Sequence, residues 1–180
     1  MPSISPRNRA DVDAATAATL NQIQAKLGSV PNMFLTLAHS PVALNAYVKL
    51  ADVAGSGKLS AKQREQIALT VGEGNQCNYC VAAHGVIGKM VGLNPTEISQ
   101  ARSGASVDAK TQAALRLAAQ IVEQRGRLGA AELSSFKAAG FVDADVLEVL
   151  VNVVLNIFTN YTNHIAGTEV DFPMPEKLAA

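Results

Sequence analysis

The sequence predicts an all-α protein: a compact multi-helix domain of about eight helices with short connections. Residues that favour helices, above all Ala, Leu, Gln, Glu and Lys, are abundant. Gly, Pro and capping residues recur at helix-length intervals, and no stretch alternates apolar and polar residues with the period of two that marks a strand. The 180 residues, nearly half of them apolar, fit a single domain, 1–180, with a sizeable core.

The segments between residues 11 and 91 begin and end at residues that favour helix termini. Gly28 follows the first segment, Ser40 and Pro41 open the third, and Ser60 with Gln63 forms a capping box at the fourth. A break at residues 74–75 separates the fourth segment from the fifth. The expected helices cover residues 11–27, 32–38, 41–55, 61–74 and about 77–91.

The second half of the chain continues the same pattern. Pro95 begins a short segment, Asp108 caps a long one, Gly140 closes the next, and Asp143 or Asp145 opens the last. The expected helices cover residues 95–103, 108–124, 130–139 and a final stretch from 143 or 145 to about 168.

Composition argues against nucleic-acid and membrane functions. Acidic and basic residues balance at fifteen each, with no dense run of Lys or Arg that would bind nucleic acid. The most apolar stretch, residues 146–158, is too short to span a bilayer and is interrupted by Glu148, Asn152 and Asn156. The first residues contain no apolar segment of signal-peptide length. We therefore expect a soluble, cytoplasmic protein.

The chemistry of this chain centres on one motif, within the segment 60–92. Cys80 follows Cys77 by three residues, and His84 follows Cys80 by four. These spacings place the side chains on one face of a helix that starts near Gln76 or Cys77. The N-terminus of a helix has unpaired N–H groups and a partial positive charge, which favour a thiolate over a thiol.

Two thiols beside an imidazole can carry out a redox cycle. One thiolate attacks, the histidine moves the proton, and the second cysteine converts the resulting sulfenic acid to a disulfide. Glu65 lies twelve residues before Cys77, on the preceding helix. If the break at residues 74–75 folds that helix back, Glu65 can approach His84 and orient its ring.

The arrangement of Glu65, Cys77, Cys80 and His84 resembles the alkyl hydroperoxidase D-like branch of the carboxymuconolactone decarboxylase superfamily. Segments 31–34 and 163–173 resemble its peroxidase-related members. The resemblance implies reduction of hydroperoxides, with Cys80 attacking, Cys77 resolving, and His84 and Glu65 relaying protons. It also implies a homo-oligomer (trimer or hexamer), an external dithiol or lipoyl-bearing protein as reductant, and no cofactor or metal.

Two further residues are candidates for the wall of the site. Tyr79 stands where the best-known peroxidase of this family has a histidine, and a phenol is a poor base at neutral pH. We expect Tyr79 to be a packed aromatic at the site wall. His164 belongs to a polar stripe along the last helix, which we interpret as a hydrogen-bonded ladder. The alternative places His164 at the edge of the active site.

Three other functions stay open at this stage. The superfamily also suggests a decarboxylase or lactone-processing enzyme, which needs a proton donor but no cysteine pair. A redox-sensing oligomer would use the disulfide to switch assembly. Zinc binding by Cys77, Cys80, His84 and His164 is a third alternative, disfavoured because the motif occurs only once.

Overall fold

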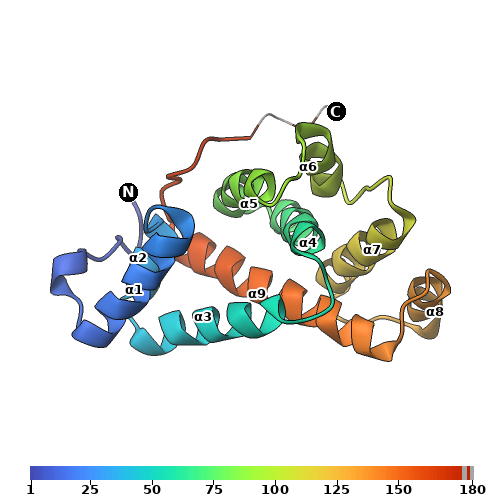
Figure 1. Cartoon of the computed structure of the whole chain (residues 1–180), viewed down its shortest axis with the longest axis horizontal. Coiled ribbons are helices and arrows are strands. Elements are labelled where there is room, and N and C mark those ends of the chain that lie inside the picture. Colours follow the sequence, from blue (N-terminus) through green and yellow to red (C-terminus); the bar gives the residue numbers. More distant parts are fainter. Residues whose placement is uncertain (176–177, 179–180) are drawn as a thin grey trace.

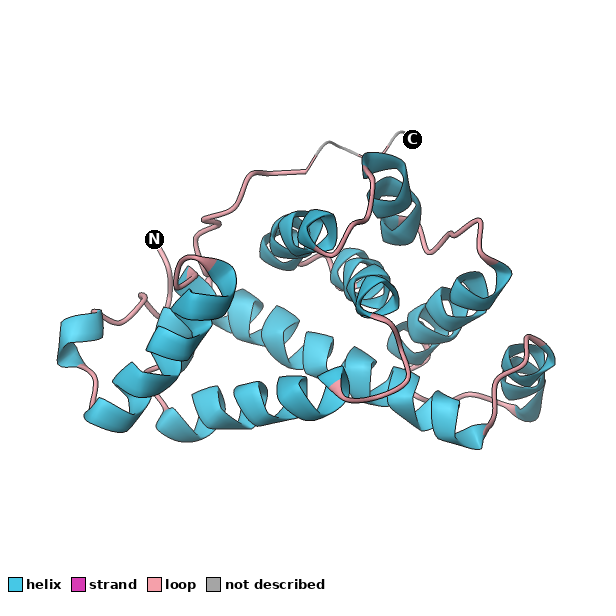
Figure 2. Cartoon of the chain, in the orientation of Figure 1, coloured by secondary structure: helices cyan, strands magenta, loops and turns pink. Residues whose placement is uncertain are grey.

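The structure is a computed structural model, and it describes residues 1–175 and 178. These residues form nine α-helices and one 3-10 turn without any strand, which confirms the all-α class (Figures 1 and 2). The elements are η1 Arg9–Asp11, α1 Ala14–Leu27, α2 Asn32–Leu37, α3 Pro41–Gly55, α4 Ala61–Gly74, α5 Asn78–Met90, α6 Pro95–Arg102, α7 Ala109–Glu123, α8 Ala130–Ala138 and α9 Asp143–Ala166.

Most of the predicted helix ends are confirmed, and two are shifted. The Ser60–Gln63 capping box is present in both directions. The first helix starts three residues later than expected, because the Asp13 carboxylate accepts the Thr16 N–H and caps it. The last helix ends at Ala166, before the expected Thr168, because Gly167 adopts the left-handed conformation with φ of 60°.

The long helix α9 runs through the middle of the molecule (Figure 1). It contacts α2, α3, α4, α5 and α7. By length and composition alone α9 could cross a membrane, which the shorter apolar stretch 146–158 could not. Its inward face contains buried Asn152, Asn156, Asn160 and Asn163 besides Val149 and Val153. We therefore interpret α9 as the core helix of a soluble fold.

The interior is divided into two apolar clusters. The larger one joins α4, α6, α7, α8 and α9 around fully buried Leu69, Leu115 and Val149. The smaller one joins α1, α2 and α3 to the start of α5, and it includes Cys77 and Cys80. The cysteine motif is therefore part of a packed interior and not of a surface loop.

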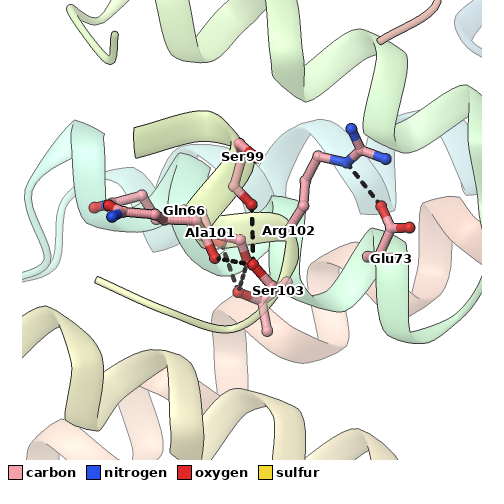
Figure 3. A network of polar contacts seen from close by, with 8 residues as sticks. Gln66, Glu73, Ser99, Ala101, Arg102 and Ser103 are labelled. Carbon is pink, nitrogen blue, oxygen red and sulfur yellow. Dashed lines mark hydrogen bonds and ion pairs between the residues drawn. The ribbon is translucent and has the colours of Figure 1, made fainter. Parts of the chain in front are cut away.

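Helix α6 packs against α4. Thr70 donates its hydroxyl to the carbonyls of Gln66 and Ala101, at 3.0 and 2.7 Å. Arg102 pairs with Glu73 at 2.8 Å, and Figure 3 shows this pair beside the bond from the Ser103 hydroxyl to the Ser99 carbonyl at the end of α6. These contacts join α6 to α4, the helix that carries Glu65.

Candidate active site

A tight turn between α4 and α5 places the cysteine pair. Gln76 adopts a left-handed conformation with φ of 56°, and the N–H of Cys77 bonds to the Gly72 carbonyl at 2.8 Å. This is the six-to-one bond of a Schellman ending, which most often uses glycine at the left-handed residue. The turn ends α4 and makes Cys77 the N-cap of α5. The expectation of a helix start at Gln76 or Cys77 is correct to within two residues.

Cys77 and Cys80 form a disulfide, with their Cα atoms 5.3 Å apart. The two residues are only 1% and 2% exposed. The Cys77 sulfur also accepts the backbone N–H of Cys80 at 3.3 Å, as the side chain of an N-cap residue does. The first turn of α5 therefore presents one of its own N–H groups to the Cys77 sulfur.

Glu65 and His84 are hydrogen-bonded to each other across the α4–α5 turn. Oε2 of Glu65 lies 2.7 Å from Nδ1 of His84, and both side chains are less than one-fifth exposed. With its Nδ1 hydrogen donated to the carboxylate, a neutral imidazole has its lone pair on Nε2. The structure thus brings together the two residues proposed to relay protons.

A largely apolar cavity of about 620 Å³ opens onto Cys80 and His84. Cys77 lies outside the described lining of this cavity, so a small molecule in it meets the Cys80 sulfur first. Lys26, Asp52 and Ser56 contribute polar groups to the lining. The remaining described lining residues are Ile23, Leu27, Pro31, Met33, Phe34, Tyr47, Val48, Ala51, Gly55, Tyr79, Ala83, Ile87, Thr159, Asn163 and Phe172.

Tyr79 lies in the wall of this cavity. Its hydroxyl accepts the Met33 N–H at 3.1 Å, and its ring packs edge-on against Phe172 at 5.7 Å. Burial, together with the neighbouring Asp171 carboxylate, holds the pKa of Tyr79 far above its usual value. Tyr79 is therefore a neutral phenol and not a base at the site.

Tyr47 stands on another side of the same cavity. Its ring packs edge-on against Phe34 and stacks on Phe158. Burial, with a smaller effect from the Glu65 charge, raises the pKa of Tyr47 to about 12. The Glu65 carboxylate therefore bonds to an imidazole and acts on a phenol through its charge.

His164 does not line the described cavity. It is exposed and stacks on Tyr161 at the outer surface of α9. The alternative that placed His164 at the edge of the site is therefore not supported within this chain. A helix turns about 100° per residue, so the neighbouring residue, Asn163, points inward instead.

Asn163 is the site residue that the sequence analysis missed. Its Nδ2 lies 3.3 Å from the Cys80 sulfur and 4.0 Å from the Cys77 sulfur. One turn earlier, Oδ1 of Asn160 accepts the Nδ2 of Asn75, at the turn before the cysteines. The asparagines of α9 therefore hold the α4–α5 turn and contact the disulfide. Their recurrence along the helix was the available sequence signal.

The described side chains hold no group of three or more His, Cys, Asp or Glu arranged to bind a metal ion. The zinc alternative needed His164 beside the cysteines, whereas His164 contacts Tyr161 at the surface. What the residues around Cys80 can do together is form and break a disulfide next to an oriented imidazole.

Comparison with known proteins identifies the same family as the motif. A model of the carboxymuconolactone decarboxylase family matches residues 41–124, which include the α4–α5 site. No curated protein is detectably similar to this chain. The fold is similar to an alkylhydroperoxidase AhpD core, an uncharacterized peroxidase-related protein from Ralstonia eutropha JMP134. The two are 26% identical over 93% of each chain, with a TM-score of 0.85.

Two other solved structures share the fold. A peroxidase-related protein from Silicibacter sp. TM1040 is 24% identical over 93% of this chain and 92% of its own, with a TM-score of 0.82. The debrominase Bmp8 in complex with 2,3,4-tribromopyrrole is 17% identical over 94% of this chain and 91% of its own, with a TM-score of 0.81. The motif, the fold and the family match agree: residues 41–124 match the carboxymuconolactone decarboxylase family, and the chain has the fold of an alkylhydroperoxidase AhpD core.

Proposed function

We propose that this protein is a thiol-dependent peroxidase that reduces hydroperoxides through a Cys77–Cys80 dithiol–disulfide cycle. The observation that carries the proposal is the placement of Cys80 and His84 in one apolar cavity, with Glu65 fixing the imidazole at 2.7 Å. The cavity is too apolar to favour a charged substrate, and its volume suits an organic molecule.

The proposed reaction balances with one hydroperoxide and one dithiol. The Cys80 thiolate attacks the outer oxygen of the peroxide, the O–O bond breaks, and the departing alkoxide takes a proton through His84. The product at Cys80 is a sulfenic acid. The Cys77 thiol attacks its sulfur, water leaves, and the disulfide forms. Two electrons pass from the cysteines to the peroxide.

A reductant must then restore the thiols. Because both sulfurs are almost fully buried, it has to reach Cys80 through the cavity. A slender dithiol, such as a lipoyl group on a carrier protein, fits this requirement better than a cysteine held on the surface of a folded protein. We propose an external dithiol or a lipoyl-bearing protein as this partner, in a cytoplasmic setting where thiols are kept reduced.

We also propose that the protein is a homo-oligomer, a trimer or a hexamer. The outer face of α9 leaves apolar side chains in solvent at helical spacing. They are Leu147, Leu150, Val154, Tyr161 and Ile165. In a symmetric assembly, a second copy of this chain would cover this face.

A second candidate function is reductive dehalogenation of a small aromatic compound. The observation that favours it is the ring of aromatic side chains beside Cys80: Phe34, Tyr47, Tyr79 and Phe172. The two thiols would again supply two electrons. The carbon–halogen bond is replaced by carbon–hydrogen, halide leaves, and the disulfide forms. A halogenated pyrrole or phenol is the substrate to test, with halide release as the readout.

Mass spectrometry of the reduced protein before and after one equivalent of cumene hydroperoxide tests the main proposal. We expect a loss of about 2 Da, localised to the Cys77–Cys80 peptide. The Cys77→Ser variant should stop at the sulfenic acid, about 16 Da heavier than its thiol.

The Cys80→Ser variant is the matched control and should stay unmodified. Thiols that remain intact in the parent protein after prolonged exposure would overturn the peroxidase proposal. Turnover of any substrate that survives Cys80→Ser would point instead to decarboxylase or lactone chemistry. A disulfide that changes the mass of the assembly, while peroxide consumption stays at background, would indicate a redox sensor.

A further inference from the structure

The contact between Asn163 and the cysteine pair goes beyond the motif. Asn163 lies on α9, more than eighty residues after the cysteines, and is 4% exposed. Its side chain lines the same cavity as Cys80 and His84. Its Nδ2 lies 3.3 Å from the Cys80 sulfur, closer than the 4.0 Å to the Cys77 sulfur.

We propose that the Asn163 side-chain amide makes Cys80 the reactive thiolate by donating a hydrogen bond to its sulfur. The inference rests on the proposed dithiol chemistry and adds a residue to it. Neither a disulfide nor a thiolate sulfur can donate a hydrogen bond, so the group that faces it must be the NH₂ of the amide and not the carbonyl. A hydrogen bond to the charged form of an acid favours that form.

The start of α5 by itself favours the wrong sulfur as the thiolate, and Asn163 counteracts this preference. Within the motif, Cys77 is the N-cap, and its sulfur receives the Cys80 N–H. Helix-end effects alone would therefore favour a thiolate at Cys77, which lies outside the described cavity lining. A donor from α9 that is nearer to Cys80 shifts this balance toward the sulfur that the substrate can reach.

The cost of burying Asn163 supports a chemical role. The hydrogen bonds of its Nδ2 go to the two sulfurs, and its Oδ1 has no partner among the described residues. A buried amide with an unpaired carbonyl lowers stability, and sulfur is a weak acceptor. A leucine would fill this position at a lower cost. The amide is therefore better explained by its effect on the sulfur than by packing.

Other groups near Cys80 also bear on its ionisation. The titratable side chains that line the cavity or contact its lining come from α1, α3, α4, α5 and the segment after α9. They are Lys26, Tyr47, Asp52, Glu65, Cys77, Tyr79, His84 and Asp171. Asn163 is the neutral donor that α9 adds to this set. Replacing it leaves the charges unchanged, which isolates the effect of the hydrogen bond.

The test is the pH dependence of Cys80 alkylation by iodoacetamide. The parent is the reduced Cys77→Ser protein, in which Cys80 is the single thiol. In this background Asn163→Leu removes the donor at similar volume. We expect the midpoint of the rate–pH curve to rise by about one unit, which means roughly tenfold less thiolate at neutral pH. The smaller Asn163→Ser, whose hydroxyl is too short to reach the sulfur, should give a similar rise.

Asn156→Leu is the matched control. Asn156 is also a buried asparagine of α9, but its amide donates to the Asn152 carbonyl and not to sulfur. The midpoint of the rate–pH curve of Asn156→Leu should stay within about 0.3 pH unit of the parent's midpoint. In the complementary Cys80→Ser background, where Cys77 is the single thiol, Asn163→Leu should shift the midpoint less, because the contact to Cys77 is longer.

The result that overturns the inference is a midpoint unchanged in both Asn163→Leu and Asn163→Ser, or one shifted equally by Asn156→Leu. Alkylation involves no peroxide, so the assay separates the two proposals. A raised midpoint in a protein that consumes no hydroperoxide would leave the role of Asn163 intact and sink the peroxidase assignment. An unchanged midpoint in a protein that reduces hydroperoxide would overturn the role of Asn163 and leave the peroxidase assignment intact.

Discussion

His84 and Glu65 are held 2.7 Å apart on two helices that meet at the turn before the cysteines. The pair joins α5 to α4 and fixes which nitrogen of the imidazole carries the hydrogen. Glu65 lies on α4, and α4 is bonded to α6 through the Thr70 hydroxyl, which donates to the Ala101 carbonyl at 2.7 Å. We expect the proposed proton relay to keep its geometry when the disulfide is reduced, because its two residues lie on helices that pack against each other.

The first prediction concerns this carboxylate. Glu65→Gln keeps the length of the side chain but removes the carboxylate that accepts from Nδ1 of His84 and orients its ring. We expect the rate of disulfide formation with hydroperoxide to fall roughly 10- to 100-fold. This is less than the roughly 10²- to 10⁴-fold contribution of an acid–base group itself, because Glu65 acts through His84. Quenched-flow mass spectrometry of the Cys77–Cys80 peptide measures this rate.

Glu73→Gln is the matched control for Glu65. Glu73 is also a carboxylate of α4, but it pairs with Arg102 at 2.8 Å and is not among the described residues that line the cavity. Its rate should stay within about twofold of the parent. Equal slowing by both substitutions would mean that α4 is merely destabilised, and it would contradict the proposed relay.

Stability at alkaline pH follows from the tyrosines at the cavity. The pKa of Tyr47 is raised from 10.0 to about 12. In the unfolded chain this phenol ionises near pH 10, while in the folded protein it stays neutral until about pH 12. The stabilisation is therefore full below pH 10 and is lost as the pH rises toward 12. Between these values the free energy of unfolding should fall by up to about 1.4 kcal/mol per pH unit for this group.

Urea denaturation between pH 8 and 11 measures this slope, for which Tyr47→Phe is the test variant. The variant should show a shallower fall above about pH 10, because it has no phenol to ionise in the unfolded state. Tyr161→Phe removes a phenol that is 52% exposed and should keep the slope of the parent. If Tyr47→Phe and the parent lose stability in parallel, burial of Tyr47 does not control the alkaline limb.

Close approach of α4 and α5 depends on Gly72. A Cβ added there would meet Val81 Cγ2 at 3.3 Å and Cys80 Cβ at 3.5 Å. Gly72→Val adds a branched side chain against these atoms, and we expect it to lower the free energy of unfolding by about 1–3 kcal/mol. Gly85, on the solvent side of α5, has no atom within 4 Å of such a Cβ. Gly85→Ala should raise the same free energy by about 0.5–1 kcal/mol.

Chemical denaturation of the two glycine variants, each compared with the parent, decides between them. Both substitutions add a side chain to a helix, yet we expect Gly72→Val to lower the free energy of unfolding and Gly85→Ala to raise it. A Gly72→Val protein as stable as the parent would mean that the two helices can separate at no cost. Slowed disulfide formation in a folded Gly72→Val protein would show that helix spacing also sets the position of Cys80.

Local sequence signals predicted much of this fold, and the site only in part. The capping box at Ser60 and the spacing of Cys77, Cys80 and His84 act within a few residues, so a single sequence shows them. Glu65 could be matched to His84 only through family resemblance, because the direction in which α4 folds back depends on tertiary packing.

Helix phase explains the error at the end of α9. The polar stripe drew attention to His164, which points outward, whereas Asn163 faces the sulfurs. A polar side chain on a largely apolar helix can be explained either by solvent or by a buried partner, and periodicity does not distinguish the two. The same limit applies to Gln76, whose left-handed backbone is unusual for a residue other than glycine.

The last prediction concerns the segment that follows α9. Helix α2 begins after Pro31, which has no side-chain oxygen to cap it, and Asp171 supplies one from the other end of the chain. Its Oδ2 accepts the Asn32 N–H at 2.8 Å. This bond holds the segment whose next residue, Phe172, packs on Tyr79 in the cavity wall.

Asp171→Ala should therefore lower the free energy of unfolding by about 1 kcal/mol, the usual value of a lost N-cap. It should also speed proteolytic cleavage after α9, because the segment loses its anchor to α2. Limited proteolysis followed by mass spectrometry locates the cut. Glu169→Ala is the control, since only the backbone carbonyl of Glu169 bonds to the Asn32 side chain. Equal cleavage of both variants would mean that Asp171 does not hold Phe172 in the cavity wall.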